Sequence, residues 1–479
     1  MKKLTIVQMN DSHAYLDIHP ELFWERGKTV YRPAGGYARI ATLLKQIRAE
    51  NPGQVILADG GDTFHGTYPA IQTKGQALVP VMNALAPDAM TAHWEFAYTP
   101  NGFKALTHRL NYPMLAMNVY EKDGDALFFK PYSVVEAGGL RIGIAGIASN
   151  IVDKVMPAQF HEGVYFTNGS KELPGVIRAL REDEQVDLVV LNSHLGYPQD
   201  MRLMESTPGV DVDLSAHTHH RLEQAVRQGT ALVTQSGSHG SFITRLDLTI
   251  ENGKATDYTH RLIEVSQYVE PDREVSGLVD EALKPYREEL ERVVGETRTP
   301  LDRGMNLEAT MDNFLLSAMH EHTGAQMVFS NGWRYGAPVV PGPITLNDLY
   351  NMVPMNPPVS SVEITGAELK TMLEENLEST FSSDPDKQMG GYTKRALGIR
   401  VFFKIENPPL KRIHKLFIGK EEVQPEKVYQ AAFITEQGVP ARFGQNRRQH
   451  DDKIIDVMQD YLAKHSPVDI GVRGTFTPI

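Results

Sequence analysis

The 479-residue sequence contains no cysteine, which excludes a disulfide, a thiolate zinc site and a cysteine nucleophile within the chain. It also has no apolar stretch long enough to cross a bilayer. Lys and Arg (48) are outnumbered by Asp and Glu (60), so the formal net charge is −12. Nonspecific binding to nucleic acid or to an anionic membrane needs a basic surface. The composition therefore argues against nucleic acid polymers and membranes as partners.

A secretory signal is also missing from the amino-terminal residues. Met1-Lys2-Lys3 leads into a short apolar run, Leu4 to Val7, which is too short for the hydrophobic region of a signal peptide. We therefore expect a cytoplasmic protein, or a periplasmic one if the chain is a trimmed export product.

The length exceeds what one hydrophobic core usually supports, so two domains are expected. In the first half, short β-branched runs alternate with helical patterns, which predicts layered α/β packing around a sheet. These expected strands lie near residues 4–9, 55–59, 88–91, 141–148, 187–192, 210–215 and 231–235.

The expected boundaries are a first domain at 1–268, a helical connector at 269–296 and a second domain at 297–479. A hairpin with its turn at 251–254 would close the first domain. The connector shows helical apolar spacing from Val279 to Val293, with Pro285 as a start or kink and Gly295 as the stop.

Residues suited to metal binding follow the expected strands of the first half. Because loops at the carboxyl ends of such strands meet at one rim, residues distant in sequence can surround a metal. Each motif alone has a high false-positive rate, but the ordered set predicts a two-metal centre in which Asp62 bridges the ions. Mixed imidazole and carboxylate ligation suits manganese, zinc, iron or cobalt better than calcium or magnesium alone. The predicted ligands are Asp11, His13, Asp62, His93, His194, His217 and His219.

The segments Asp11-Ser12-His13, Gly60-Gly61-Asp62, Asn192 to Gly196 and Ala216 to His219 resemble those of the calcineurin-like metallophosphoesterases. Over nearly its whole length, the chain resembles the two-domain 5′-nucleotidase superfamily. This resemblance implies an α/β (α+β) fold with a four-layer αββα metallophosphoesterase domain followed by a C-terminal α/β substrate domain. It also implies two divalent metal ions, with manganese expected first and zinc or iron as alternatives.

Two positions depart from the family where its catalytic proton donor is expected. By resemblance, His93 falls on a metal-binding asparagine, Trp94 on the catalytic histidine and Ala97 on its aspartate partner. A positioned acid is worth about 10²- to 10⁴-fold, and a strongly basic alkoxide needs it most. A thiol has a pKa near 8.5, so a sulfur leaving group needs less help.

The substrate loops also depart from the family's pattern for binding nucleotides. By resemblance, Gly336 stands in the place of a phosphate-binding arginine, and Met355 replaces a phenylalanine that stacks on a nucleobase. The predicted substrate-binding residues are Asn331, Trp333, Arg334, Tyr335 and Met355.

His93-Trp94-Glu95-Phe96, together with Gln235 to Phe242, resembles the SoxB-type thiosulfohydrolase branch of the superfamily. That branch implies a dimanganese centre whose bridging hydroxide attacks the sulfonate sulfur of an S-thiosulfonate on a carrier-protein tail. The predicted catalytic residues are Asp62, His93, Trp94 and His239, with Trp94 walling the channel.

Two alternatives remain open at this point. The first is a 5′-nucleotidase, another phosphomonoesterase or a nucleotide-sugar hydrolase that acts on an anionic small molecule, with His239 supplying the proton. The second is a noncatalytic binding protein that contains metal. His65, His320 and His322 are expected on the surface or in helices.

Overall fold

The computed structural model describes residues 1–251 and 253–479. The chain divides into two compact units. The N-terminal unit comprises Met1–His19 and Pro33–Pro285, and the C-terminal unit comprises Pro20–Arg32 and Tyr286–Ile479.

The first sheet of the N-terminal unit has five strands. β1 runs parallel to β4, and β4 runs parallel to β5, whereas β14 and β15 are antiparallel additions on the other side of β1. In spatial order the strands are β15 (Lys254–Glu264), β14 (Phe242–Glu251), β1 (Lys2–Met9), β4 (Val55–Asp59) and β5 (Ala89–Met90).

The second sheet has six strands, and its four central strands are parallel. The two edge strands, β12 and β7, are antiparallel to their neighbours. The order is β12 (Val226–Gln228), β13 (Ala231–Thr234), β11 (Val212–Leu214), β10 (Leu188–Ser193), β8 (Leu140–Ile147) and β7 (Tyr132–Ala137). A separate two-stranded sheet pairs β6 (Val119–Glu121) with β9 (Val164–Phe166).

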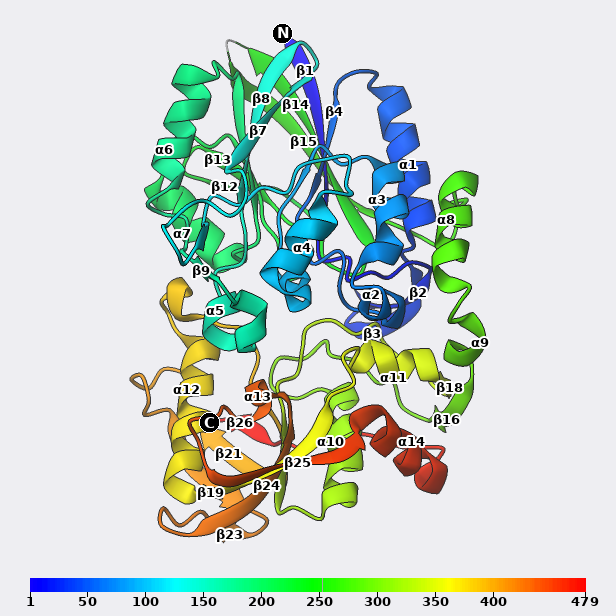
Figure 1. The fold of residues 1–479 in the computed structure, drawn as a ribbon, viewed down its shortest axis with the longest axis vertical. Coiled ribbons are helices and arrows are strands. Elements are labelled where there is room, and N and C mark those ends of the chain that lie inside the picture. Colours follow the sequence, from blue (N-terminus) through cyan, green and yellow to red (C-terminus); the bar gives the residue numbers. More distant parts are fainter. Residues whose placement is uncertain (252) are drawn as a thin grey trace. The chain divides into compact units, whose positions relative to one another are not determined.

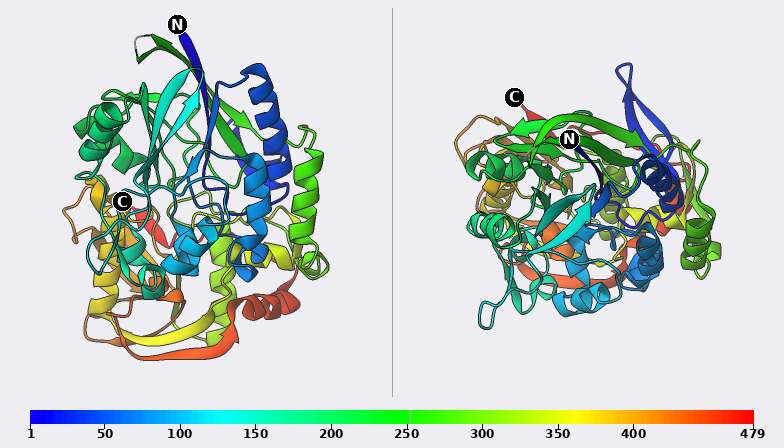
Figure 2. Two further views of the ribbon diagram at one scale, coloured as in Figure 1. Left: turned by 45° about the horizontal axis from the view of Figure 1, so that its top comes forward. Right: turned by 90° about the horizontal axis from the view of Figure 1, so that it is seen from above.

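Helices cover the outer faces of both sheets (Figures 1 and 2). Helices α1, α3 and α8 lie on the side of the first sheet, and α6 and α7 lie on the side of the second. The helices of this unit are α1 (Tyr37–Glu50), α2 (Tyr68–Gln72), α3 (Val79–Leu85), α4 (Pro100–Thr107), α5 (Val152–Val155), α6 (Leu173–Arg178), α7 (Tyr197–Ser206) and α8 (Arg273–Leu283).

Strand β10 shows why the layers form. Leu188 and Val190 belong to the apolar core between the two sheets, whereas Val189 and Leu191 belong to the core shared with α6 and α7. Alternate residues of a strand face opposite sides, so a continuously apolar strand is buried on both faces. The order helix, sheet, sheet, helix is the four-layer arrangement expected from the sequence.

The C-terminal unit is built on a five-stranded sheet, and α12 packs against it through the core that contains Leu369 and Leu373. This sheet has the order β20 (Arg395–Leu397), β17 (Met327–Ser330), β24 (Val428–Ile434), β19 (Pro358–Thr365) and β25 (Gln445–Lys453). A four-stranded sheet has the order β23 (Glu421–Glu422), β22 (Ile413–Ile418), β21 (Ile399–Phe403) and β26 (Phe476–Pro478).

Two strand pairs complete the sheets: β16 (Val293–Thr297) with β18 (Gly342–Thr345), and β2 (His19–Glu25) with β3 (Lys28–Ala34). The helices of the C-terminal unit are α9 (Arg287–Leu290), α10 (Thr310–Thr323), α11 (Leu346–Met352), α12 (Gly366–Phe381), α13 (Thr435–Gly438) and α14 (Ile454–His465).

The helix expected through residues 270–295 is wrong in its second half. α8 ends at Leu283, the short α9 follows after Pro285, and Val293 and Gly295 lie in strand β16. Proline removes a backbone donor and clashes with the preceding turn, so the break at this residue follows from its chemistry. Gly295 pairs with Ile344 of β18 instead of ending a helix.

The closing hairpin expected after residue 245 is present as the antiparallel pair β14 and β15. Asn252 of its expected turn lies outside the described residues. Among the helices that the structure describes, none has the length and apolar character needed to span a bilayer.

Candidate metal centre

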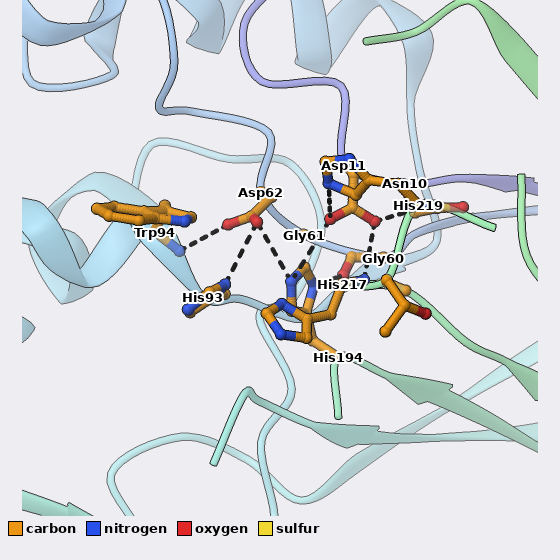
Figure 3. A network of polar contacts seen from close by, with 12 residues as sticks. Asn10, Asp11, Gly60, Gly61, Asp62, His93, Trp94, His194, His217 and His219 are labelled. Atoms are coloured by element: carbon orange, nitrogen blue, oxygen red, sulfur yellow. Dashed lines mark hydrogen bonds and ion pairs between the residues drawn. The ribbon is translucent and has the colours of Figure 1, made fainter. Parts of the chain in front are cut away.

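The loops at the carboxyl ends of the central strands carry the predicted ligands. Asp11 and His13 follow β1, Asp62 follows β4 and His93 follows β5. His194 follows β10 of the second sheet, and His217 and His219 follow β11. All seven predicted ligands fall into two groups. Figure 3 shows Asp11, Asp62, His93, His194, His217 and His219 gathered together.

The backbone of these loops is strained. Five of the seven residues have a positive φ, between 48° and 72°: Asp11, His13, Asp62, His217 and His219. Each such residue costs on the order of 1–3 kcal/mol and persists only where the surrounding structure enforces it, most often at functional sites. Close packing adds to this constraint, since a Cβ on Gly61 (φ +85°) would lie 2.7 Å from the Thr91 carbonyl oxygen.

The first group comprises Asp62, His93, His194 and His217, and the second comprises Asp11, His13 and His219. Within each group, the potential ligand atoms all lie within 4.8 Å of one another. Asp62 links the groups because its Oδ2 lies 3.3 Å from His93 Nδ1, 3.4 Å from His194 Nε2 and 3.7 Å from His13 Nε2.

The carboxylates of Asp62 and Asp11 interact strongly with the surrounding histidines. Burial raises the pKa of Asp62, but His93, His194 and His13 outweigh burial and hold this pKa well below its usual range. Burial lowers the pKa of His194, but the carboxylates of Asp62 and Asp11 outweigh it and raise the pKa to about 10. Ionised carboxylates among imidazoles are a donor set that suits two divalent transition ions, with Asp62 shared between them.

Surrounding groups fix the orientation of the ligands. His194 Nδ1 lies 2.6 Å from the Gly60 carbonyl oxygen, which directs its Nε2 toward Asp62. Asp11 Oδ2 accepts hydrogen bonds from Asn10 Nδ2 (2.7 Å) and from the His217 backbone N–H (2.9 Å). Such supporting contacts set the tautomer and geometry of metal ligands.

Glu95 ties two of the ligand loops together. Its carboxylate is fully buried, and Oε1 accepts hydrogen bonds from the backbone N–H groups of Thr63 (2.6 Å) and Phe64 (3.2 Å). Oε2 accepts one from the backbone N–H of His93 (2.9 Å). Glu95 therefore holds the loop after Asp62 at a fixed distance from His93.

Trp94 borders the first group. Its backbone N–H donates to Asp62 Oδ1 at 2.7 Å, which leaves Oδ2 to the histidines. Its indole ring stacks on the ring of His65 (centroids 4.9 Å apart, 23° between planes) and meets Phe160 edge to face.

The expectation that His65 is a surface or helix histidine is wrong. His65 is fully buried, and its carbonyl oxygen lies 3.2 Å from His13 Nδ1. Burial lowers the pKa of His65 to about 4. Sequence reasoning did not place His65 beside the site because its neighbour Phe64 is apolar. The signal that could have placed it there is its position three residues after Asp62.

His239 lies next to the second group. Its backbone N–H donates to the Asp11 carbonyl oxygen at 2.7 Å. Its ring centroid lies 6.2 Å from that of His13 and 6.1 Å from that of His219. Among the residues predicted for catalysis, His239 is thus beside the metal ligands without being a member of either ligand group.

The predicted substrate residues lie in the C-terminal unit. Trp333 and Tyr335 are buried with nearly parallel rings, whereas Asn331 and Arg334 are half-buried. Asn331 Nδ2 donates to the Tyr392 hydroxyl at 3.1 Å, and Arg334 contacts the Gly390 carbonyl oxygen. The predicted residue outside this loop, Met355, is 43% exposed.

A comparison with protein families finds a match within the C-terminal unit. Residues 293–436 match the family model described as 5′-nucleotidase, C-terminal domain. A trifunctional nucleotide phosphoesterase protein from Bacillus subtilis is 24% identical to this chain. The matched region covers 86% of this chain and 30% of that longer protein. A 5′-nucleotidase from Vibrio parahaemolyticus is 23% identical, with 98% of this chain and 90% of the relative covered.

Solved structures show the same fold over both units. The sulfate thiohydrolase SoxB of Thermus thermophilus superposes with a TM-score of 0.93 at 23% identity, covering 99% of this chain and 96% of SoxB. A 5′-nucleotidase precursor from Thermus thermophilus gives a TM-score of 0.86 at 23% identity, covering 100% and 99%. The α/β fold and the resemblance to the two-domain 5′-nucleotidase superfamily are confirmed.

Proposed function

We propose that the chain is a metal-dependent hydrolase that cleaves phosphate esters or anhydrides of small, nucleotide-like anions. The sequence relatives are named for nucleotide chemistry, so they favour this alternative over hydrolysis of a sulfur ester. The observation that carries the proposal is the position of Asp62 Oδ2 between histidines of both ligand groups.

The proposed roles follow from the geometry. Asp11, His13, Asp62, His93, His194, His217 and His219 would hold two divalent ions, with manganese as the first candidate. Such ions polarise a phosphoryl group and lower the pKa of water, so that a nucleophile forms near neutral pH. Trp94 fixes Asp62 through its backbone N–H, and His239 borders the second group. Asn331 and Arg334 are the proposed substrate contacts of the C-terminal unit.

A direct assay tests this proposal. Protein loaded with Mn²⁺ is expected to release phosphate from nucleoside diphosphates or monophosphates, and chelation is expected to abolish the release. Asp62→Asn should lower kcat/KM by more than about 100-fold, since changes to groups that only support metal ligands already reach that size. His414→Ala, on the exposed side of β22, is the matched control. Phosphate release that is unaffected by chelation, or absent with every phosphate substrate, contradicts the proposal.

A second candidate function is hydrolysis of an S-thiosulfonate on a small molecule or a carrier-protein tail. The observation that favours it is the presence of Trp94 and Ala97 where the family resemblance expects a histidine and an aspartate. The test is release of sulfate from an S-sulfonated cysteine peptide by the Mn²⁺-loaded protein. Sulfate release faster than phosphate release from every nucleotide would select this candidate over the first.

The role of His239 needs its own variant. If His239 donates the proton to a departing alkoxide, His239→Ala should slow nucleoside monophosphates by about 10²-fold or more and anhydrides much less. Equal effects on both substrate types would remove His239 from that role.

A further inference from the structure

One face of a short helix beside Asp62 is apolar. The 3-10 helix η2 (Trp94–Tyr98) follows directly after His93. In a 3-10 helix, residues three apart stand one above the other, so Trp94 and Ala97 share a face. Both side chains pack, half-buried, against the same apolar cluster. This face presents an indole and a methyl group, neither of which can give up a proton at neutral pH.

Two polar side chains of this helix are engaged in hydrogen bonds within the fold. The Glu95 carboxylate accepts three backbone N–H groups, and the Tyr98 hydroxyl donates to the carbonyl oxygens of Phe64 and Ala70 at 2.8 and 3.0 Å. His65 stacks with its ring against the indole of Trp94 and is fully buried. The Glu95 carboxylate and the Tyr98 hydroxyl therefore hold the helix in place, and the His65 ring supports the indole of Trp94.

We propose that this Trp94–Ala97 wall selects substrates whose leaving group departs as a stable anion, so that phosphoanhydrides and other activated esters are cleaved and simple alkyl phosphates are not. The inference rests on the proposed two-metal hydrolysis and names the substrate class within it. In the step, water adds its hydroxyl to phosphorus and loses its remaining proton to solvent. The bond from phosphorus to the leaving oxygen breaks, and that oxygen keeps the electron pair.

The acidity of the leaving group decides how much this step needs a proton donor. A phosphate leaving group has a second pKa of about 6. A thiol has a pKa of about 8.5. The pKa of a phenol such as tyrosine is near 10. The pKa of water, used here as the reference for an alcohol, is near 15.7. Where the wall supplies no acid to the leaving group, an alkyl ester loses about 10²- to 10⁴-fold in rate, whereas an anhydride loses little. Nucleoside diphosphates and their conjugates fit better than nucleoside 5′-monophosphates.

A leaving-group series tests the inference on the unaltered full chain. Mn²⁺-loaded protein is assayed with dinitrophenyl, nitrophenyl, phenyl and alkyl phosphates and with a nucleoside diphosphate. We expect kcat/KM to fall steeply along the series, with the alkyl ester about 10²- to 10⁴-fold below the most activated aryl ester. Similar rates for alkyl and aryl esters would overturn the inference.

Two variants separate the wall from general effects on the fold. The double variant Trp94→His with Ala97→Asp places a hydrogen-bonding pair on the same face, and it should raise the alkyl rate relative to the aryl rate by at least about 10-fold. Trp94→Phe keeps the aromatic wall without a proton donor and should keep the steep series. If the double variant does not fold, the series on the unaltered protein with Trp94→Phe still decides the question.

The outcomes distinguish this inference from the function on which it rests. Absence of metal-dependent hydrolysis with every substrate, including the most activated ester, contradicts the proposed function itself. Metal-dependent hydrolysis without a leaving-group preference leaves that function standing and rejects the role of the wall. A steep series that the double variant leaves unchanged also rejects it, since the preference would then arise elsewhere.

Discussion

At the scale of single residues, the candidate metal centre depends on side chains that are not metal ligands themselves. Asp62 and His93 come from different strands, yet Glu95 accepts hydrogen bonds from the backbone of both loops. Burial raises the pKa of Glu95, and the three N–H donors are what stabilise the charged form against that burial. A carboxylate can accept on both oxygens, whereas an amide offers only one acceptor.

Glu95→Gln is therefore expected to weaken metal binding without removing a ligand. The amide NH₂ group would face a backbone N–H, donor against donor, and loosen His93 relative to Asp62. We expect the affinity for Mn²⁺ to fall by about 10- to 100-fold, the usual effect of altering groups that support metal ligands. Calorimetric titration of Mn²⁺ into metal-free protein measures this.

The matched control is Glu281→Gln on the exposed side of α8, which should bind Mn²⁺ as the unaltered chain does. Unchanged affinity in Glu95→Gln would show that the two loops hold their positions without this carboxylate.

At the scale of elements, local chemistry fixes where helices begin and end. A capping box formed by Thr365 and Glu368 begins α12. Thr365 Oγ1 accepts from the Glu368 backbone N–H, and Glu368 Oε2 accepts from the Thr365 backbone N–H at 2.9 Å. Pro285 likewise acts locally, because α8 ends just before it. The apolar spacing that predicted a start or kink there did not reveal that Val293–Thr297 pairs with β18.

Thr365→Ala should destabilise the C-terminal unit by about 1 kcal/mol, within the range of 0.5–2 kcal/mol typical of lost N-caps. Chemical denaturation of the full chain, followed by far-UV circular dichroism, measures the change. Thr371→Ala, at an exposed position of the same helix, should change the free energy of unfolding by less than about 0.5 kcal/mol. Equal effects of the two substitutions would contradict the role of the cap.

At the scale of the whole molecule, the stability of the metal-free protein should depend on pH through buried acids. Burial raises the pKa of Asp59 to about 7, against about 3.9 in an unfolded chain. Between these values the folded chain keeps a proton that the unfolded chain releases. The contribution of Asp59 to stability is therefore greatest at low pH and falls as pH rises from about 4 to about 7.

The contribution of Asp59 to this slope is about 1.4 kcal/mol per pH unit, or about 4 kcal/mol over the window. Asp59→Asn keeps an oxygen to accept from Gly61 and Thr63 but cannot ionise, so its stability should be less dependent on pH. Thermal unfolding in chelator at pH 4 to 8 measures the difference, with the exposed Asp123→Asn as control. Parallel curves for the native chain and Asp59→Asn would refute the assignment.

The sequence by itself determined which residue types follow which strands. The apolar, β-branched runs of β1, β4, β8 and β10 predict these strands, because buried strands have a recognisable local pattern. The ligand motifs are visible in the loops that follow the strands. The four layers followed from those runs together with the family resemblance.

Only the tertiary structure decided how residues far apart in the chain meet. No local pattern shows that His65 stacks on Trp94, that Glu95 spans the Asp62 and His93 loops, or that Asp62 Oδ2 lies between two groups of histidines. These contacts depend on the register of two packed sheets and on strained loops with positive φ. Long-range packing sets both, because a strained conformation persists only where many distant contacts enforce it.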